Sequence, residues 1–252
     1  MAVSPGGRRV FVTGGSAGRT AGADYATVAY SAATGRQLWV SRYTSPGNGS
    51  DEASSVAVSP AGTRVFVTGY GSFAGTTHRD YATVAYGAAA GRRLWVSRYN
   101  GPGGGSDEAS AVAVSPAGTR VFVTGYSFGG TAGRDYATVA YGAAAGRRLW
   151  VSRYTGPGSG VDEASSVAVS PGGARVFVTG VSSGRKSSAY ATVAYGAAAG
   201  RRLWVSRYNG PGNGEDTAVA VAVSPAGTTV YVTGTSDGGT AEFDYATVAY
   251  RG

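Results

Sequence analysis

Short apolar runs separated by turn-forming residues dominate this chain. One stretch contains ASSVAVS (residues 53–59), RVFVTG (64–69), DYATVAY (80–86) and RLWVSRY (93–99). Valine, alanine and aromatic residues fill these runs, and most of them favour strands. The runs are separated by SPAG, by a variable Gly/Ser segment and by GAAAGR, all typical of turns and loops. The pattern predicts four consecutive short strands, which we call A, B, C and D.

This four-strand unit is repeated along the chain. The phrase Ala-Val-Ser-Pro recurs five times at intervals of 54 to 56 residues, with its serine at Ser4, Ser59, Ser115, Ser170 and Ser224. Four strands at such a period are typical of a blade of a β-propeller. We therefore predict an all-β fold, a five-bladed β-propeller of four-stranded antiparallel blades. A β-solenoid or a linear array of repeats is the alternative.

The repeat defines one predicted domain, residues 1–252, with blades at about 1–49, 50–105, 106–160, 161–214 and 215–252. The chain starts inside a strand A and stops after a strand C. We therefore expect the last blade to lack its outer strand and the first to have only a stub of strand A. Three alternatives follow: the ring closes without an interleaved blade, a partner chain supplies strands, or the chain is part of a longer array.

Composition narrows the classes of protein. Leucine occurs only at Leu38, Leu94, Leu149 and Leu203, and isoleucine is absent, which disfavours folds built on long amphipathic helices. Without cysteine there is no disulfide framework and no thiolate zinc site. No apolar stretch is long enough to span a bilayer, and MAVSPGGRRVFV lacks the layout of a signal peptide. We therefore expect neither a transmembrane segment nor a signal peptide.

Two motifs carry a family resemblance. SPAGTTVYVTG (224–234) resembles a bacterial propeller repeat with an S-P-D-G turn followed by V-Y-V-T. AYSAATGRQLW (29–39) resembles the tryptophan-docking motif A-x-D-x-x-T-G-x-x-x-W of quinoproteins. The chain is similar to highly repetitive bacterial β-propeller repeat proteins of the quinoprotein-like (PQQ-like), YVTN or SBBP type. The aspartates of both motifs are replaced, for example by Ala226 and Ser31.

The resemblance implies structural and cellular features. It implies a bacterial, extracytoplasmic protein, and it implies that the docking tryptophans stack between blades as structural residues. These are Trp39, Trp95, Trp150 and Trp204. No constellation for binding a quinone can be matched, so no quinone is expected. In the family most such repeat proteins have no assigned activity.

Charged residues separate between the two faces of the predicted ring. All fourteen acids fall in the loops of one face, called upper here, together with Arg19, Arg79, Arg134, Arg185 and Lys186. The turns of the lower face hold no acid and twelve arginines: Arg8, Arg9, Arg36, Arg64, Arg92, Arg93, Arg120, Arg147, Arg148, Arg175, Arg201 and Arg202. The arginine-rich lower face could bind an anionic polymer or a lipid surface. Alternatively, the acidic upper face of one ring could stack head-to-tail on the basic lower face of the next. The alternative is that the arginines serve only solubility.

Acidic pairs before strand A are candidates for ligand binding. They are Asp51-Glu52, Asp107-Glu108, Asp162-Glu163 and Glu215-Asp216. A carboxylate ring at the upper mouth of the channel would suit calcium or a cationic ligand. The alternative is that each pair meets Arg79 or Arg134, or accepts hydrogen bonds from local backbone amides. No regular calcium-binding loop is present, and no bound cofactor is expected.

A second candidate set lies where strand C begins: Asp80, Tyr81, Asp135 and Tyr136. Together with Tyr70, these residues suggest a lectin-like carbohydrate site. Catalytic signals are poor, because the only histidine is His78 and the G-x-S-x-G match at residues 14–18 is not followed by a helix. We predict a non-enzymatic scaffold or binding module for a protein or glycan ligand on the acidic upper face. The alternatives are a lectin-like binder or a fragment of a quinoprotein-like or glycosidase enzyme.

Overall fold

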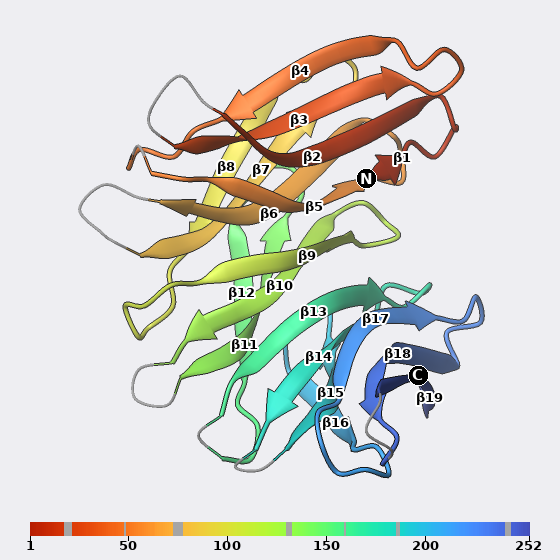
Figure 1. Cartoon of the computed structure of the whole chain (residues 1–252). Helices are drawn as coiled ribbons and strands as arrows, with labels where there is room; N and C mark the ends of the chain where they lie inside the picture. Colours follow the sequence, from red (N-terminus) through yellow and green to blue (C-terminus); the bar gives the residue numbers. More distant parts are fainter. Residues whose placement is uncertain are drawn as a thin grey trace.

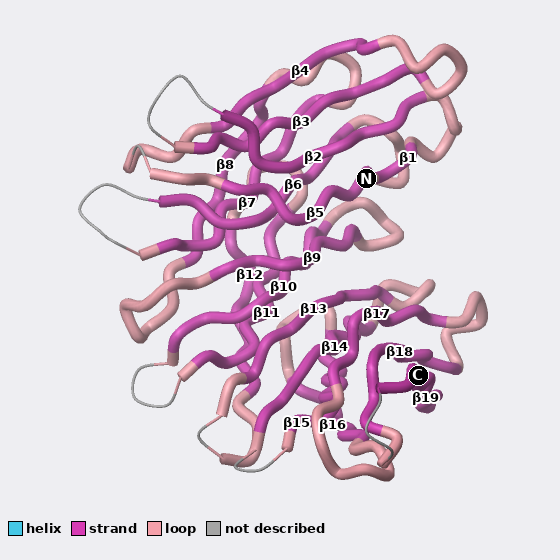
Figure 2. Tube along the Cα trace, in the orientation of Figure 1, coloured by secondary structure: helices cyan, strands magenta, loops and turns pink. Residues whose placement is uncertain are grey.

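The computed structural model of the chain describes residues 1–17, 22–47, 49–72, 78–129, 133–158, 160–184, 187–239 and 243–252. Within these ranges the regular secondary structure is β only, as Figure 2 shows. No helix in the described residues is long and apolar enough to cross a membrane. The prediction of an all-β fold is confirmed.

The strands form five antiparallel sheets in chain order. The first contains β1 (Ala2–Val3), β2 (Arg9–Ala17), β3 (Ala23–Ser31) and β4 (Gln37–Tyr43). The second contains β5 (Glu52–Val58), β6 (Arg64–Ser72), β7 (Arg79–Gly87) and β8 (Arg93–Tyr99). The third contains β9 (Glu108–Val114), β10 (Arg120–Phe128), β11 (Arg134–Gly142) and β12 (Arg148–Tyr154). The fourth contains β13 (Asp162–Val169), β14 (Arg175–Ser183), β15 (Ser188–Gly196) and β16 (Arg202–Tyr208). The fifth contains β17 (Thr217–Val223), β18 (Thr229–Asp237) and β19 (Phe243–Arg251).

These sheets match the predicted repeat in detail. The first strand of the first sheet is a two-residue stub, and the fifth sheet has three strands, both as expected. The turn between the first two strands of a sheet is closed by its serine. The Ser59 hydroxyl accepts the N–H of Arg64 at 3.0 Å, while Gly62 takes a φ of +67°, which glycine adopts without strain. This serine fixes the turn although Ala61 replaces the aspartate of the family motif.

Consecutive sheets pack face to face around a common centre (Figure 1). The first strands lie nearest that centre, since β5, β9, β13 and β17 contact one another in order. We call the face of each sheet that meets the next sheet its forward face, and the opposite one its reverse face. The forward face of the second sheet presents aromatic Phe66, Tyr81 and Trp95 to small or β-branched residues of the third, such as Val123 and Ala137. The same pattern builds the other three interfaces.

Directed hydrogen bonds from a tyrosine and a tryptophan also cross the interfaces. The Tyr81 hydroxyl donates to the carbonyl of Ala137 at 3.0 Å, and the indole Nε1 of Trp95 donates to the carbonyl of Ala143 at 3.1 Å. The tyrosine bond recurs at all four interfaces, and the tryptophan bond at the first three. Buried aromatic residues are therefore fixed in direction as well as packed.

The arc of sheets is open. Among the described residues, extensive contacts between sheets join only consecutive ones, and the first and fifth sheets do not pack on each other in this way. Burial agrees, because β6 and β10 are covered on both faces whereas β2 and β18 alternate between buried and exposed positions. Of the three alternatives for closure, a ring closed by the first and fifth sheets is therefore not observed.

Candidate functional site

The aspartates before each first strand are buried inside the loops that join the sheets. Asp51, Asp107, Asp162 and Asp216 are at most 1% exposed. The carboxylate of Asp107 accepts the N–H of Gly101 at 2.6 Å and the N–H of Phe128 at 2.9 Å. Burial raises the pKa of Asp107, and these backbone donors oppose the rise. These carboxylates fix the loops, so the expectation that the aspartates line the upper mouth is corrected.

The neighbouring glutamates lie at the surface and pair with tyrosine and arginine. The Tyr70 hydroxyl donates to Glu52 at 3.0 Å, and the Arg79 guanidinium lies 4.2 Å from the centroid of the Tyr70 ring. Arg79 in turn donates to Glu108 of the third sheet at 2.7 Å. The series continues with Arg134, which lies over Tyr126 and donates to Glu163. The two ion pairs therefore neutralise opposite charges locally, at the steps from the second to the third sheet and from the third to the fourth.

This series ends at the fourth and fifth sheets. Val181 occupies the position of Tyr70, and Ser188 that of Arg79. Glu215 is exposed and forms an isolated parallel bridge with Ser188, and no ion pair of Glu215 is observed within the described residues. The upper face is therefore uneven around the arc, and the predicted quasi-equivalent sites differ in their side chains.

The residues considered for a sugar site are buried in the strands. Strand β7 begins at Arg79, so Asp80 and Tyr81 lie near its start, as predicted for strand C. Tyr81 and Tyr136 are fully buried between sheets, each with its hydroxyl bonded to a carbonyl of the next sheet. Neither ring can stack on a sugar at the surface. The expectation that these tyrosines contact a glycan is corrected.

The aspartates beside these tyrosines differ from one sheet to the next. Asp135 pairs with Arg153 at 3.1 Å, while burial and the nearby Asp107 raise the pKa of Asp80 to about 6. One carboxylate oxygen, Oδ1, of each accepts no hydrogen bond. In the fourth sheet Ala189 replaces the aspartate. The described residues contain no group of three or more acids or histidines placed to hold a metal.

The lower turns carry exposed arginines, as the sequence indicates. Arg8, Arg9 and Arg36 surround a hollow of about 410 Å³ below the first sheet, and no acid lines it. Binding of an anionic polymer at this face stays a prediction. Four charged residues assigned to the upper face, Arg19, Arg185, Lys186 and Glu242, lie outside the described residues.

An apolar surface that the sequence analysis did not single out lies on the forward face of the fifth sheet. Tyr231 is 46% exposed and Tyr245 is 85% exposed. Their equivalents in the second sheet, Phe66 and Tyr81, are completely buried. All four side chains are aromatic. The third sheet covers the pair in the second sheet, whereas no described sheet covers the pair in the fifth.

The reverse face of the first sheet is uncovered in the same way. Val12 is 39% exposed, whereas the equivalent Val67 is fully buried against the preceding sheet. Val10, Val28 and Tyr30 of this face are only partly buried. The two uncovered faces, which we call the end faces, are therefore the two halves of the interface that the chain repeats four times.

Comparisons with known proteins agree with this arrangement. No protein-family model matches the chain, and no curated protein matches it. Among solved structures, the chain is similar to hydrazine synthase of Kuenenia stuttgartiensis, with a TM-score of 0.61 and 12% identity over 99% of this chain and 61% of that one. It is also similar to the Dos1 propeller, with a TM-score of 0.55 and 10% identity over 89% of this chain and 47% of that one. The fold is that of a β-propeller.

TolB from Acinetobacter baumannii is a further similar structure, with a TM-score of 0.50 and 17% identity over 94% of this propeller chain and 51% of TolB. At these identities the likeness concerns the fold alone. The propeller chain spans between about half and three fifths of the length of these three chains.

Proposed function

We propose that this propeller chain is a non-enzymatic interaction module that binds protein through its two end faces. One contrast carries the proposal: Tyr245 is 85% exposed, whereas the equivalent Tyr81 is completely buried. Contiguous apolar surface of this kind marks a site of protein association. The proposal needs neither a catalytic residue nor a cofactor.

The partner that fits the two end faces is a second copy of the chain, because their residues match those that meet at the interfaces within the chain. The forward face offers Tyr231 and Tyr245, and the reverse face offers Val12 and Val28, as in the interfaces within the chain. Tyr190 donates its hydroxyl to the carbonyl of Ala246 at 3.2 Å. In the proposed contact Tyr245 donates in the same way to Ala26 of the second copy. Such an association is head-to-tail, because two different faces meet.

Sedimentation velocity tests this proposal with two single variants. Tyr245→Lys places a charge on the forward end face, and Val12→Lys places one on the reverse end face. Each variant alone should be monomeric at concentrations where the unchanged chain associates, because burying an unpaired charge is costly. A mixture of the two should form heterodimers and nothing larger, since each retains one intact end face.

The control is Val161→Lys, which changes an exposed valine in the loop before β13, away from both end faces. This variant should associate like the unchanged chain. A monomeric unchanged chain across the whole concentration range would show that the end faces do not bind a second copy. Association that survives both lysine substitutions would show that copies meet through some other surface.

A further inference from the structure

Three arginines border one hollow at the lower end of the first sheet. Arg8 and Arg9 lie where β2 begins, Arg36 lies just before β4, and the hollow between them measures about 410 Å³. Gly62, from the first turn of the second sheet, also lines it, as does Leu38, which packs against the core between the two sheets. This arginine hollow is therefore bordered by two sheets of the chain, unlike either end face.

Backbone hydrogen bonds hold the three arginines around the hollow. The carbonyl of Arg8 accepts the N–H of Ala32 at 3.0 Å, and the carbonyl of Arg36 accepts the N–H of Ser31 at 2.8 Å. Ser31 in turn pairs with Arg9 in the ladder between β2 and β3. The sheet therefore fixes the backbone positions from which all three guanidinium groups extend.

The positive charge around the arginine hollow is not balanced by acids. No carboxylate lines it, and no ion pair of Arg8, Arg9 or Arg36 is observed in the part of the chain that the structure describes. A guanidinium group carries N–H donors in a rigid fork that matches the oxygens of an oxyanion. Three such groups at one concave surface favour an anion that accepts hydrogen bonds from more than one of them.

The first repeat differs from the others at two positions of this hollow. The equivalents of Arg8 are Thr63, Thr119, Ala174 and Thr228, and those of Ser31 are Gly87, Gly142, Gly196 and Arg251. The backbone is the same, since the N–H of Ala88 donates to the carbonyl of Thr63 at 2.9 Å, as that of Ala32 does to Arg8. Only the first repeat therefore combines this extra guanidinium with a hydroxyl, which favours one site over five equivalent contacts.

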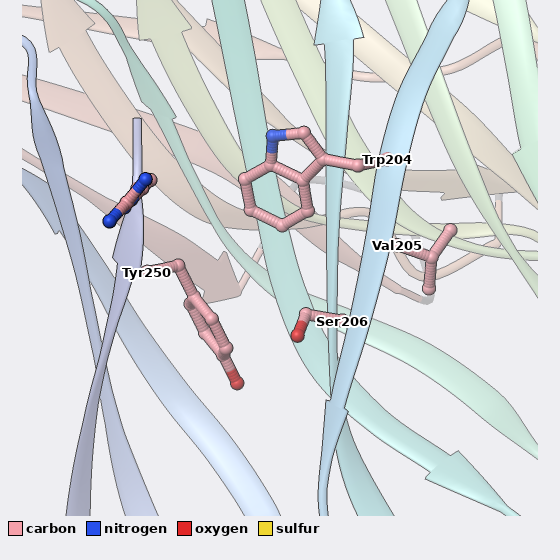
Figure 3. Close-up of a pocket in the computed structure, with 5 residues that line it drawn as sticks. Trp204, Val205, Ser206 and Tyr250 are labelled. Atoms are coloured by element: carbon pink, nitrogen blue, oxygen red, sulfur yellow. The ribbon is translucent and has the colours of Figure 1, made fainter.

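The hollow beside Trp204 has a different lining. It measures about 250 Å³ and is lined by Trp204, Val205, Ser206, Tyr250 and Arg251 (Figure 3). It has two aromatic rings and one cation, whereas the arginine hollow has three cations and no aromatic side chain. The arginine hollow therefore favours recognition by charge rather than by stacking, and its volume is that of a small-molecule site.

We propose that the arginine hollow binds the phosphate group of a small phosphate monoester. The phosphate oxygens accept hydrogen bonds from the guanidinium groups of Arg8, Arg9 and Arg36, and the Ser31 hydroxyl donates another. A phosphate monoester carries about two negative charges and three strong acceptor oxygens, so it engages several guanidinium groups at once. This inference goes beyond the proposed function, because the arginine hollow takes no part in the contact between end faces.

Isothermal titration calorimetry with glucose 6-phosphate tests the inference, with glucose as the probe that lacks the phosphate. The unchanged chain should bind one glucose 6-phosphate and no glucose, and inorganic phosphate should compete. Arg8→Thr introduces the residue found at Thr63, and Arg36→Gln removes a second exposed guanidinium. Each should weaken binding at least about tenfold, because a charge-assisted hydrogen bond is lost. The control is Arg147→Gln, which removes the arginine equivalent to Arg36 from the third sheet and should leave binding unchanged.

Absence of saturable binding, or equal losses in Arg36→Gln and Arg147→Gln, would overturn the inference. Cosedimentation with vesicles of phosphatidylcholine and phosphatidic acid distinguishes the source of the phosphate. Vesicle binding without binding of glucose 6-phosphate would assign the hollow to a lipid headgroup and overturn the small-molecule site. The titration is repeated on the Val12→Lys chain, which has a changed reverse end face. Binding there supports the phosphate site whether or not copies associate, and association without phosphate binding supports the end faces and contradicts the phosphate site.

Discussion

At the scale of single residues, the acidic pairs show how one sequence feature takes two roles. Asp107 and Glu108 are neighbours in an extended segment, where consecutive side chains point to opposite sides. Asp107 therefore points into the loop and accepts backbone N–H groups, while Glu108 points outward to Arg79. The pairing of acids in the sequence could not distinguish these two environments.

Because the two acids differ in environment, substituting each of them should lower the free energy of unfolding by a different amount. Asp107→Ala leaves the buried N–H groups of Gly101 and Phe128 without an acceptor and should destabilise the fold by about 2 to 4 kcal/mol. Glu108→Ala removes a partly exposed ion pair and should cost less than about 1 kcal/mol. Urea unfolding of both variants measures the difference. Equal costs would contradict the assignment of Asp107 to the loop structure.

Asp80 carries a pH dependence whose sign follows from its environment. Its pKa of about 6 in the folded chain lies above the ordinary value of 3.8, so folding favours the protonated form. The contribution of Asp80 to stability is present at acidic pH and is lost as the pH rises through 6. Asp80→Asn should therefore stabilise the chain at neutral pH, on the order of 2 kcal/mol, and change little in acid.

Urea unfolding on either side of pH 6 measures this effect. The comparison variant is Asp135→Asn, which removes the ion pair with Arg153. That substitution should destabilise the chain at neutral pH. A stabilising effect of both substitutions would contradict the distinction between the two sites.

At the scale of the element, each interface between sheets depends on the tryptophan of its outer strand. Trp95 lies between Phe66 of its own sheet and Tyr141 of the next, and its indole N–H is bonded to Ala143. Trp204 packs between Phe177 and Tyr250 but makes no such bond to a carbonyl in the described residues. It also lines the hollow shown in Figure 3.

Substituting the two tryptophans should therefore have different effects. Trp95→Ala removes a well-packed ring and a hydrogen bond and should cost about 3 to 5 kcal/mol. Trp204→Ala should cost at least about 1 kcal/mol less, because the ring is less covered and the bond is absent. Thermal and urea unfolding compare the variants. Equal losses in the free energy of unfolding would contradict the weaker packing and hydrogen bonding assigned to Trp204.

The strands themselves could be predicted closely, because turns and apolar runs are short and regular. The roles of Asp80 and Tyr81 could not, because the sequence placed both at the start of strand C without showing that neighbouring segments bury them. A pattern of residue types predicts where a strand lies, but it does not show how much of each strand end the neighbouring sheets cover.

At the scale of the whole molecule, the number of sheets, their strand order and the three-stranded last sheet could be predicted from the repeat. The opening of the arc could not. Five nearly identical repeats specify nearly identical interfaces, and the angle between sheets depends on the close packing of rings such as Trp39 and Tyr86. Composition does not encode that angle. The exposed positions of Val12 and Tyr245 follow from it.

The four matching interfaces have a consequence for how the chain can change in length. Every interior sheet presents the same forward and reverse faces, so removing or duplicating one whole repeat leaves each remaining contact with a suitable partner. A recombination event between two repeats of the gene, in register, would thus yield a shorter or longer arc without any new packing problem. The end faces would stay the same at every length.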